Sequence, residues 1–415
     1  GTMRNMRSKY IWFYVEPYVY VEVNKWECLL VNTLDKQFIY SKDQQVLSFL
    51  RDFMSPLNTG VSSVAPNLFS LVEFKRFIGE VRHKFIGDLV VTDTLDSKPI
   101  QITSNAKIMH DVREGKYASF DDPLNYLHEI TIHTNSSCSS SCESCVNYFK
   151  QFDCCTKNRN VIRNEALSVI TKILKELDFA RKRIRINLVV TDEIYAKSDE
   201  LIDILNKYDN DFYLVVNYNN IRKLTSRLCS FFQNRISVII AGVQISEIDF
   251  SILKDLDLTF FVENEVELEN VCSFINSELS NCRYVIRPIF NGKNMPFFKK
   301  YVFLKKKEVL NSIDSMQDIH RNKLLNTSFF GKLLVFSDGS IYNNVHFKKM
   351  GNIKEYDLSY FVHKSLVNPN SSWFYTRNRA PCSKCVYKYI CPPPSNYELF
   401  MNQFALCDKS CVLNC

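Results

Sequence analysis

The chain has 415 residues, of which 46% are hydrophobic and 23% are charged; this composition allows a sizeable core and excludes a disordered chain. At roughly 150 residues per domain, the length predicts two or three domains. The net charge of +7 is scattered over short runs, and no apolar run is long enough for a membrane-spanning helix. We therefore expect neither a nucleic-acid partner nor a membrane partner.

The first hundred residues predict a small module of strands and a helix. Residues 10–23 are rich in aromatic and β-branched side chains, and Val19–Val23 alternate between apolar and other residues, which is typical of strands in hairpins. Val46–Phe53 is apolar at helical spacing. We assign residues 3–100 to this N-terminal module, and the polar stretch Arg113–Pro123 to a connector.

From residue 125, segments with strand and helix character alternate. Strands are predicted at Glu129–His133, Ile184–Val190, Phe212–Val216, Ile236–Ile240, Thr259–Val262 and Tyr284–Ile289. Helices are predicted at Asn164–Leu177, Leu201–Tyr208, Ile221–Phe232, Phe250–Leu256 and Val266–Leu279. This order indicates successive βαβ units, so we predict an α/β fold with a six-unit partial barrel of parallel strands over residues 125–295. In such folds the functional site lies at the carboxyl ends of the strands.

The 15 cysteines are unevenly placed along the chain. Five fall between Cys138 and Cys155, and six between Cys382 and Cys415. No secretory segment, with charged residues followed by an apolar run, is recognisable near the start of the sequence, so we expect a cytoplasmic protein. In a long chain of that kind, clustered and closely spaced cysteines favour metal binding over disulfides.

The first cysteine set directly follows the first predicted barrel strand. Cys138, Cys142 and Cys145 are separated by three and two residues. Three thiolates can hold three irons of a 4Fe-4S cluster and leave the fourth iron open to a small molecule. Together with the six predicted βα units, this set resembles the radical S-adenosylmethionine (SAM) superfamily, whose three cysteines hold a cluster that binds and cleaves SAM.

The resemblance also implies a SAM pocket, and the sequence departs from the family there. Ser144 stands where the family usually has an aromatic residue, and residues 190–193 read Val-Thr-Asp-Glu in place of the usual Gly-Gly-Glu stretch. Asp192 and Glu193 are the acidic residues we place beside SAM, and Arg287 is a candidate partner for a carboxylate of SAM or substrate. A zinc or cluster site without SAM chemistry, and plain buried thiols, remain alternatives.

The second cysteine set resembles the SPASM extension of radical SAM peptide-modifying enzymes, which we assign to residues 325–415. It consists of Cys382-x2-Cys385-x5-Cys391, with Cys407, Cys411 and Cys415 beyond it, and a hairpin with a turn at Ser337-Asp338-Gly339 precedes it. The resemblance implies one auxiliary 4Fe-4S cluster held by Cys382, Cys385, Cys391 and either Cys407 or Cys411. Zinc is the alternative.

Three further stretches of sequence make the resemblance specific to a smaller group of proteins. They are Tyr126-Leu-His-Glu-Ile130, Ser372-Trp-Phe-Tyr-Thr-Arg377 and Cys391-Pro-Pro-Pro-Ser-Asn-Tyr-Glu398. They resemble the radical SAM/SPASM proteins, and their degenerate pseudo-radical-SAM relatives, that are encoded with double-glycine-leader peptides in Bacteroidales. The N-terminal module is similar to the small winged modules of these systems, which take up a leader peptide as an added strand. The alternative is that it is a structural cap on the barrel.

These resemblances predict an iron–sulfur protein of ribosomal peptide maturation. Its partner would be a ribosomally made precursor peptide, from which a 5′-deoxyadenosyl radical abstracts hydrogen. The alternative is a catalytically degenerate scaffold that binds the precursor peptide and a paralogous radical SAM maturase. No side chain is assigned a catalytic role.

Overall fold

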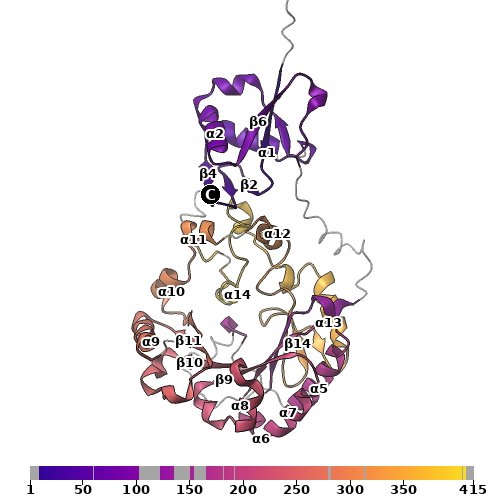
Figure 1. Cartoon of the computed structure of the whole chain (residues 1–415), viewed down its shortest axis with the longest axis vertical. Coiled ribbons are helices and arrows are strands. Elements are labelled where there is room, and N and C mark those ends of the chain that lie inside the picture. Colours follow the sequence, from indigo (N-terminus) through magenta and orange to yellow (C-terminus); the bar gives the residue numbers. More distant parts are fainter. Residues whose placement is uncertain are drawn as a thin grey trace, which may run out of the picture.

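The computed structural model describes residues 9–58, 60–101, 122–134, 150–153, 165–180, 182–190, 192–278, 282–312, 315–403 and 405–407. The N-terminal module stands at one end of an elongated molecule and the large parallel sheet at the other (Figure 1). Between them lie α11 (Lys306–Asn311), α12 (Met316–Leu324) and residues near the C-terminus (Figure 1).

Six parallel strands, from the edge strand β12 to β7, make up two thirds of a nine-stranded sheet in the order β12-β11-β10-β9-β8-β7-β13-β14-β15. Five parallel pairings join them in chain order. The predicted parallel sheet is therefore confirmed. The six strands are β7 (Glu129–His133), β8 (Arg185–Val189), β9 (Asp211–Asn217), β10 (Ile236–Ala241), β11 (Asp257–Val262) and β12 (Tyr284–Pro288).

Helices cover one face of this sheet, and α14 (Asn396–Met401) lies on the other side (Figure 1). Because side chains alternate between the faces of a strand, Leu188 and Leu214 pack against the covering helices while Val189 and Val215 face the opposite way. The covering helices are α5 (Ala166–Leu177), α6 (Asp192–Ala196), α7 (Ser198–Leu205), α8 (Ser226–Phe232) and α9 (Glu265–Glu278).

The connection between β10 and β11 differs from the prediction. Instead of a helix over Phe250–Leu256, the chain makes two 3-10 turns, Gly242–Glu247 and Phe250–Ile252. The Asp249 carboxylate accepts the Ser251 N–H and so starts the second turn. The turn ends at Ile252, where the Leu253 N–H donates to the Phe250 carbonyl, and Asp255 takes a left-handed conformation with φ of 67°. This left-handed residue stops a helix from continuing to Leu256.

The sheet continues into the C-terminal part of the chain. The predicted hairpin is present as β13 (Lys332–Val335) and β14 (Ser340–Tyr342), with Gly339 at φ of 85° in its turn. Its first strand pairs in parallel with β7, which the sequence did not reveal. The C-terminal part is thus built directly onto the first barrel strand. Its other elements are β15 (Gly351–Asn352), α10 (Met295–Tyr301) and α13 (Leu358–Val367).

The N-terminal module contains two three-stranded antiparallel sheets around α1 (Gln44–Phe53) and α2 (Val72–His83). One sheet has the order β5-β1-β6, formed by β5 (Val61–Ser63), β1 (Tyr10–Val15) and β6 (Gly87–Thr92). The other has the order β2-β3-β4, formed by β2 (Val19–Val23), β3 (Cys28–Asn32) and β4 (Phe38–Ser41). Phe13 of β1 makes edge-to-face contacts with Phe49 and Phe53 of α1, within one core that also includes residues of α2 and of both sheets.

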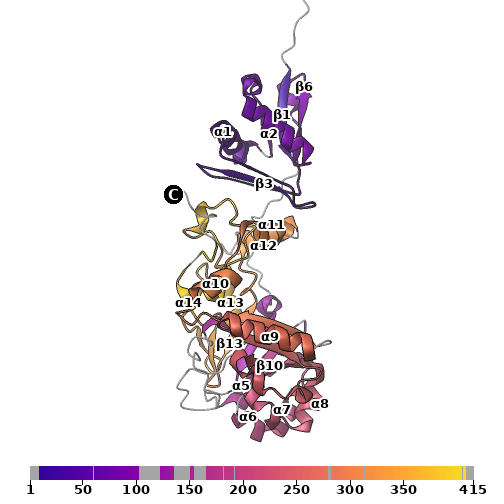
Figure 2. The same ribbon diagram turned by 90° about the vertical axis from the view of Figure 1, so that its left-hand side faces the viewer.

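The β2-β3-β4 sheet also packs on the C-terminal part of the chain. Figure 2 shows β3 lying across the base of the module, above α11 and α12. Tyr20, Leu29 and Val31 of this sheet share a buried cluster with residues of α11, of α12 and of the segment 386–390. Within the described residues, no helix is long and apolar enough to cross a bilayer.

Candidate metal centre

The first cysteine set, Cys138, Cys142 and Cys145, lies outside the described residues. The structure does describe the residues that precede it. Strand β7 ends at His133, and the next residue, Thr134, is buried and donates from its N–H and Oγ1 to the Val189 carbonyl, at 3.1 and 3.0 Å. Thr134 therefore lies at the carboxyl end of β7, beside the carboxyl end of β8.

The residues proposed to contact SAM lie at two places on this edge. Asp192 and Glu193 begin α6 directly after β8, and their side chains lie outside the described part of the structure. Arg287 lies on β12, five strands away from β7, and is exposed. Its guanidinium carbon lies 5.4 Å from the ring centre of Phe152, which follows the first cysteine segment.

Aromatic side chains fill the inner face of the sheet near this end. Phe152 stacks on Phe261 with ring centres 4.7 Å apart and meets Tyr397 edge-on at 5.6 Å. The Tyr397 hydroxyl donates to the Pro288 carbonyl at 2.6 Å. Phe152 and Tyr397 lie against Val189, Val215, Ile239 and Ile289 from the strands. The sequence analysis did not find this cluster, since its members are separated by up to 245 residues and share no spacing.

Four predicted ligands of the second cysteine set line one small cavity of about 30 Å³. They are Cys382, Cys385, Cys391 and Cys407. Cys382 is buried, and the other three are partly buried. Burial raises the pKa of the Cys391 thiol, and the thiols of Cys385, Cys382 and Cys407 raise it further, which they do only from close range. Of the two candidates for the last ligand, Cys407 is at the site, and Cys411 lies outside the described residues.

Loops bring these cysteines together. Cys382 begins a 3-10 turn, Cys382–Lys384, whose end at Cys385 is marked by the Cys385 N–H donating to the Cys382 carbonyl at 2.9 Å. The Cys391 N–H donates to the Tyr387 carbonyl at 2.9 Å. Cys407 is brought alongside by a bridge to Leu304, whose N–H donates to the Leu406 carbonyl at 3.0 Å.

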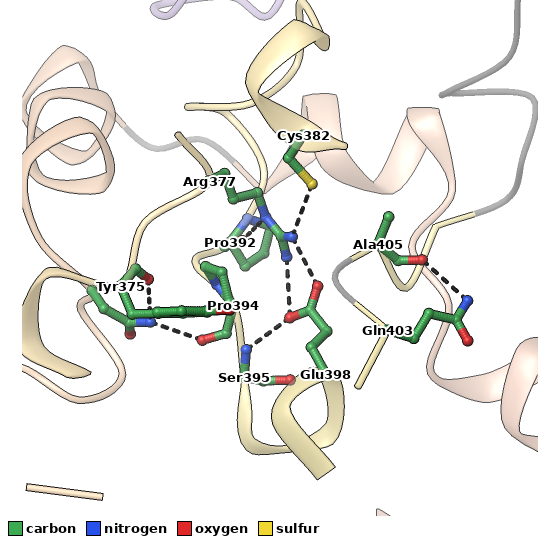
Figure 3. Close-up of polar contacts among 10 residues, drawn as sticks. Tyr375, Arg377, Cys382, Pro392, Pro394, Ser395, Glu398, Gln403 and Ala405 are labelled. Carbon is green, nitrogen blue, oxygen red and sulfur yellow. Dashed lines mark hydrogen bonds and ion pairs between the residues drawn. The ribbon is translucent and has the colours of Figure 1, made fainter. Parts of the chain in front are cut away.

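A buried ion pair stands beside the four thiols. Arg377 is 6% exposed and Glu398 is 2% exposed, and Nη1 of the arginine lies 2.8 Å from Oε1 of the carboxylate. Figure 3 shows the guanidinium between Glu398 and Cys382, and its Nη1 donates to Cys382 Sγ at 3.6 Å. Burial opposes the charge on the guanidinium, but Glu398 and the thiols of Cys391 and Cys382 outweigh it, so the pKa of Arg377 is raised.

Hydrogen-bond donors also reach this set of thiols. Four thiols face one space, and N–H groups point at two of the sulfurs: Arg377 donates to Cys382, and the Tyr387 N–H donates to Cys385 Sγ at 3.4 Å. Such donors accompany cluster thiolates in iron–sulfur proteins. Among the described residues, no three His, Cys, Asp or Glu groups are close enough together to hold a single metal ion.

Comparisons with known proteins reveal only distant similarity. No family model and no curated protein matches the chain. Among solved structures, it is similar to native anSMEcpe with bound AdoMet, at 14% identity and a TM-score of 0.42. The same protein with AdoMet and the Kp18Cys peptide gives 14% and 0.44, and with the Cp18Cys peptide 13% and 0.43. Each alignment covers 67% of this chain and 96% of the other. Likeness at this level assigns no function, which has to come from the residues of this chain.

Proposed function

We propose that this chain is an iron–sulfur protein of the radical SAM/SPASM type that modifies a ribosomally made precursor peptide. The observation that carries the proposal is the meeting of Cys382, Cys385, Cys391 and Cys407 at one cavity beside a buried arginine. These are four of the five C-terminal residues that the SPASM resemblance implies as ligands. We propose that they hold an auxiliary 4Fe-4S cluster.

The proposal places a second cluster at Cys138, Cys142 and Cys145. Its support is that Thr134, four residues before Cys138, lies at the carboxyl end of β7, and α/β folds hold their sites at such strand ends. A cluster with an open iron supplies the chemistry of reductive SAM cleavage and hydrogen abstraction. In this proposal Asp192, Glu193 and Arg287 contact SAM or the substrate.

The N-terminal module supplies a place for the peptide in this proposal. Strand β6 (Gly87–Thr92) pairs with β1 along one edge, and no described strand pairs with its other edge. Val91, Leu95 and Ile100 beside it are 55%, 58% and 95% exposed. An extended segment of the precursor peptide could add to this edge as a fourth strand, with its backbone providing the hydrogen bonds.

A second candidate function is the scaffold without SAM turnover, and one observation favours it. Phe152 and Tyr397 occupy the inner face of the sheet near its carboxyl end, where an enzyme of this kind needs room for its cofactor and substrate. In that case the chain would bind the precursor peptide and an active paralogue. The departures at Ser144 and residues 190–193 point the same way. The narrower likeness to double-glycine-leader systems of Bacteroidales is compatible with both candidates.

Metal analysis and spectroscopy test the proposal. Iron and acid-labile sulfide are measured on the anaerobically reconstituted chain, on Cys382→Ala/Cys385→Ala and on Cys138→Ala/Cys142→Ala. We expect each variant to lose part of the iron. The control is Cys229→Ala/Cys272→Ala, because both cysteines are exposed on outer helices and the substitution should leave the iron content unchanged. Zinc without iron in the unmodified chain would contradict the proposal.

Electron paramagnetic resonance then separates the two candidates. The dithionite-reduced Cys382→Ala/Cys385→Ala chain should give the signal of the first cluster alone. A signal that shifts when SAM is added supports the enzyme, because SAM must then bind the open iron. A cluster signal indifferent to SAM supports the scaffold.

A further inference from the structure

We propose that the buried pair of Arg377 and Glu398 sets the reduction potential of the cluster at the four-cysteine site, with the two charges acting in opposite directions. This inference rests on the proposed function, because it requires a redox-active group at Cys382, Cys385 and Cys391.

The geometry fixes the guanidinium firmly at the site. Its Nη1 donates to Cys382 Sγ at 3.6 Å and to Glu398 Oε1 at 2.8 Å, its Nη2 donates to Glu398 Oε2 at 3.4 Å, and its Nε donates to the Pro392 carbonyl. Pro392 directly follows the ligand Cys391. The guanidinium thus bridges the backbone beside one ligand and the sulfur of another, so it cannot swing away without breaking several hydrogen bonds.

The carboxylate of Glu398 is held as firmly. Its Oε2 accepts the Ser395 N–H at 2.7 Å as part of the capping box that starts α14. Burying an ion pair costs free energy that a well-packed apolar pair would not cost. A buried pair beside four thiols is therefore poorly explained by stability alone, whereas placing a fixed charge next to a redox group explains its position.

The other cations at the cavity are engaged elsewhere. Lys388 Nζ lies 2.8 Å from Glu22 Oε1, in a pair that is 15% and 20% exposed. Lys306 Nζ lies over the rings of Tyr40 and Tyr387, at 5.6 and 5.7 Å from their centres. Arg377, by contrast, donates directly to a ligand sulfur.

The direction of each effect follows from electrostatics. Reduction adds one negative charge to the cluster and its thiolates. A cation and an N–H donor at a ligand sulfur stabilise that charge and raise the reduction potential, while a nearby carboxylate lowers it. Because both groups are buried, solvent screens these effects little. Loss of the Arg377 charge should lower the potential, and loss of the Glu398 charge should raise it.

Redox titration of the auxiliary cluster alone tests the inference. The full-length chain carrying Cys138→Ala, Cys142→Ala and Cys145→Ala is reconstituted with iron and sulfide and titrated with dithionite, followed by electron paramagnetic resonance. Arg377→Met and Glu398→Gln are compared with Arg379→Met, which removes the same charge from an exposed neighbour. We expect shifts of about tenfold or more in the reduction equilibrium, or about 59 mV for one electron. The shift should be downward for Arg377→Met and upward for Glu398→Gln, and Arg379→Met should change little.

Opposite shifts distinguish an electrostatic role from a structural one, because a loosened site would affect both variants alike. If both potentials match that of Arg379→Met, or both move in the same direction, the inference is wrong. If Arg377→Met fails to retain iron, Glu398→Gln decides: a raised potential supports the inference, and an unchanged one overturns it. A site that takes zinc and no iron ends the proposed function and this inference together, whereas a cluster of unmoved potential ends the inference alone.

Discussion

His346 is a titratable loop residue that holds a segment near the proposed first metal centre. Its Nε2 lies 2.6 Å from the carbonyl oxygen of Lys150, which belongs to the short described segment after the first cysteine set. Burial lowers the pKa of His346 below its ordinary value of 6.5, and the Lys150 ammonium lowers it further, although the hydrogen bond to the Lys150 carbonyl partly opposes them. The imidazole is therefore neutral in the folded protein near pH 7.

Acid should weaken the fold through this histidine. Above the unfolded-state pKa, His346 is neutral in both states and has no effect on stability. As the pH falls below about 6.5, the unfolded chain takes up the proton more readily, so the free energy of unfolding falls until the lower folded-state pKa is reached. Denaturant unfolding of His346→Gln should show a smaller loss between about pH 7 and pH 5.5 than the unmodified chain. His83→Gln, at an exposed site on α2, is the control, and equal pH profiles for all three would contradict the assignment.

At the level of residues, the sequence predicted which cysteines would lie together better than it predicted their surroundings. The SPASM resemblance grouped Cys382, Cys385 and Cys391 with Cys407 or Cys411, and the structure brings the first three and Cys407 to one cavity. Arg377 was quoted only as part of a resembling stretch, because nothing local marks an arginine that pairs with a carboxylate 21 residues away across an irregular loop. Phe152 and Tyr397 were missed for the same reason. Long-range contacts between loop residues leave no periodic pattern.

At the level of elements, the parallel strands were predicted closely, because buried strands are continuous apolar runs between polar turns. The strand Glu129–His133 has the predicted bounds. The parallel pairing of β13 with β7 could not be predicted, because two strands about 200 residues apart give no sign of being neighbours. The contacts of helix α14 could not be predicted either. Its consecutive residues reach two different places: Tyr397 contacts β12, and Glu398 pairs with Arg377 at the four-cysteine site.

Removal of one hydroxyl on α14 should loosen the edge strand β12. The Tyr397 hydroxyl donates to the Pro288 carbonyl at 2.6 Å, and burial raises the pKa of this phenol, so it stays protonated and able to donate. Tyr397→Phe should cost about 1 kcal/mol of stability. It should also speed hydrogen exchange of the β12 amides, measured by mass spectrometry. Tyr284→Phe, at an exposed position on the same strand, is the matched control, and equal exchange in the two variants would contradict the role assigned to the hydroxyl.

At the level of the whole molecule, the N-terminal module packs against α11, α12 and the segment that carries Cys385 and Cys391. Residues 384–388 of that segment make polar contacts with β2 and with the residue that follows it. Tyr20 is 4% exposed and donates its hydroxyl proton to the Val386 carbonyl at 2.8 Å, Glu22 pairs with Lys388, and Asn24 donates to the Lys384 carbonyl at 2.8 Å. The conformation of the segment between Cys385 and Cys391 therefore also determines the surface against which β2 and β3 pack.

If the proposed cluster is bound at Cys385 and Cys391, its removal should release the N-terminal module. The segment between the two cysteines would then be free to rearrange, and Tyr20, Leu29 and Val31 would lose the residues they pack against there. We expect faster hydrogen exchange at β2 and β3 in the metal-free chain than in the reconstituted one, with β9 and β10 unchanged as an internal control. Tyr20→Phe should produce part of the same effect in the reconstituted protein, whereas Tyr18→Phe, whose hydroxyl donates to the exposed Phe85 carbonyl, should not. If the exchange rates at β2 and β3 change neither on metal removal nor in Tyr20→Phe, the N-terminal module is held independently of the cysteine site.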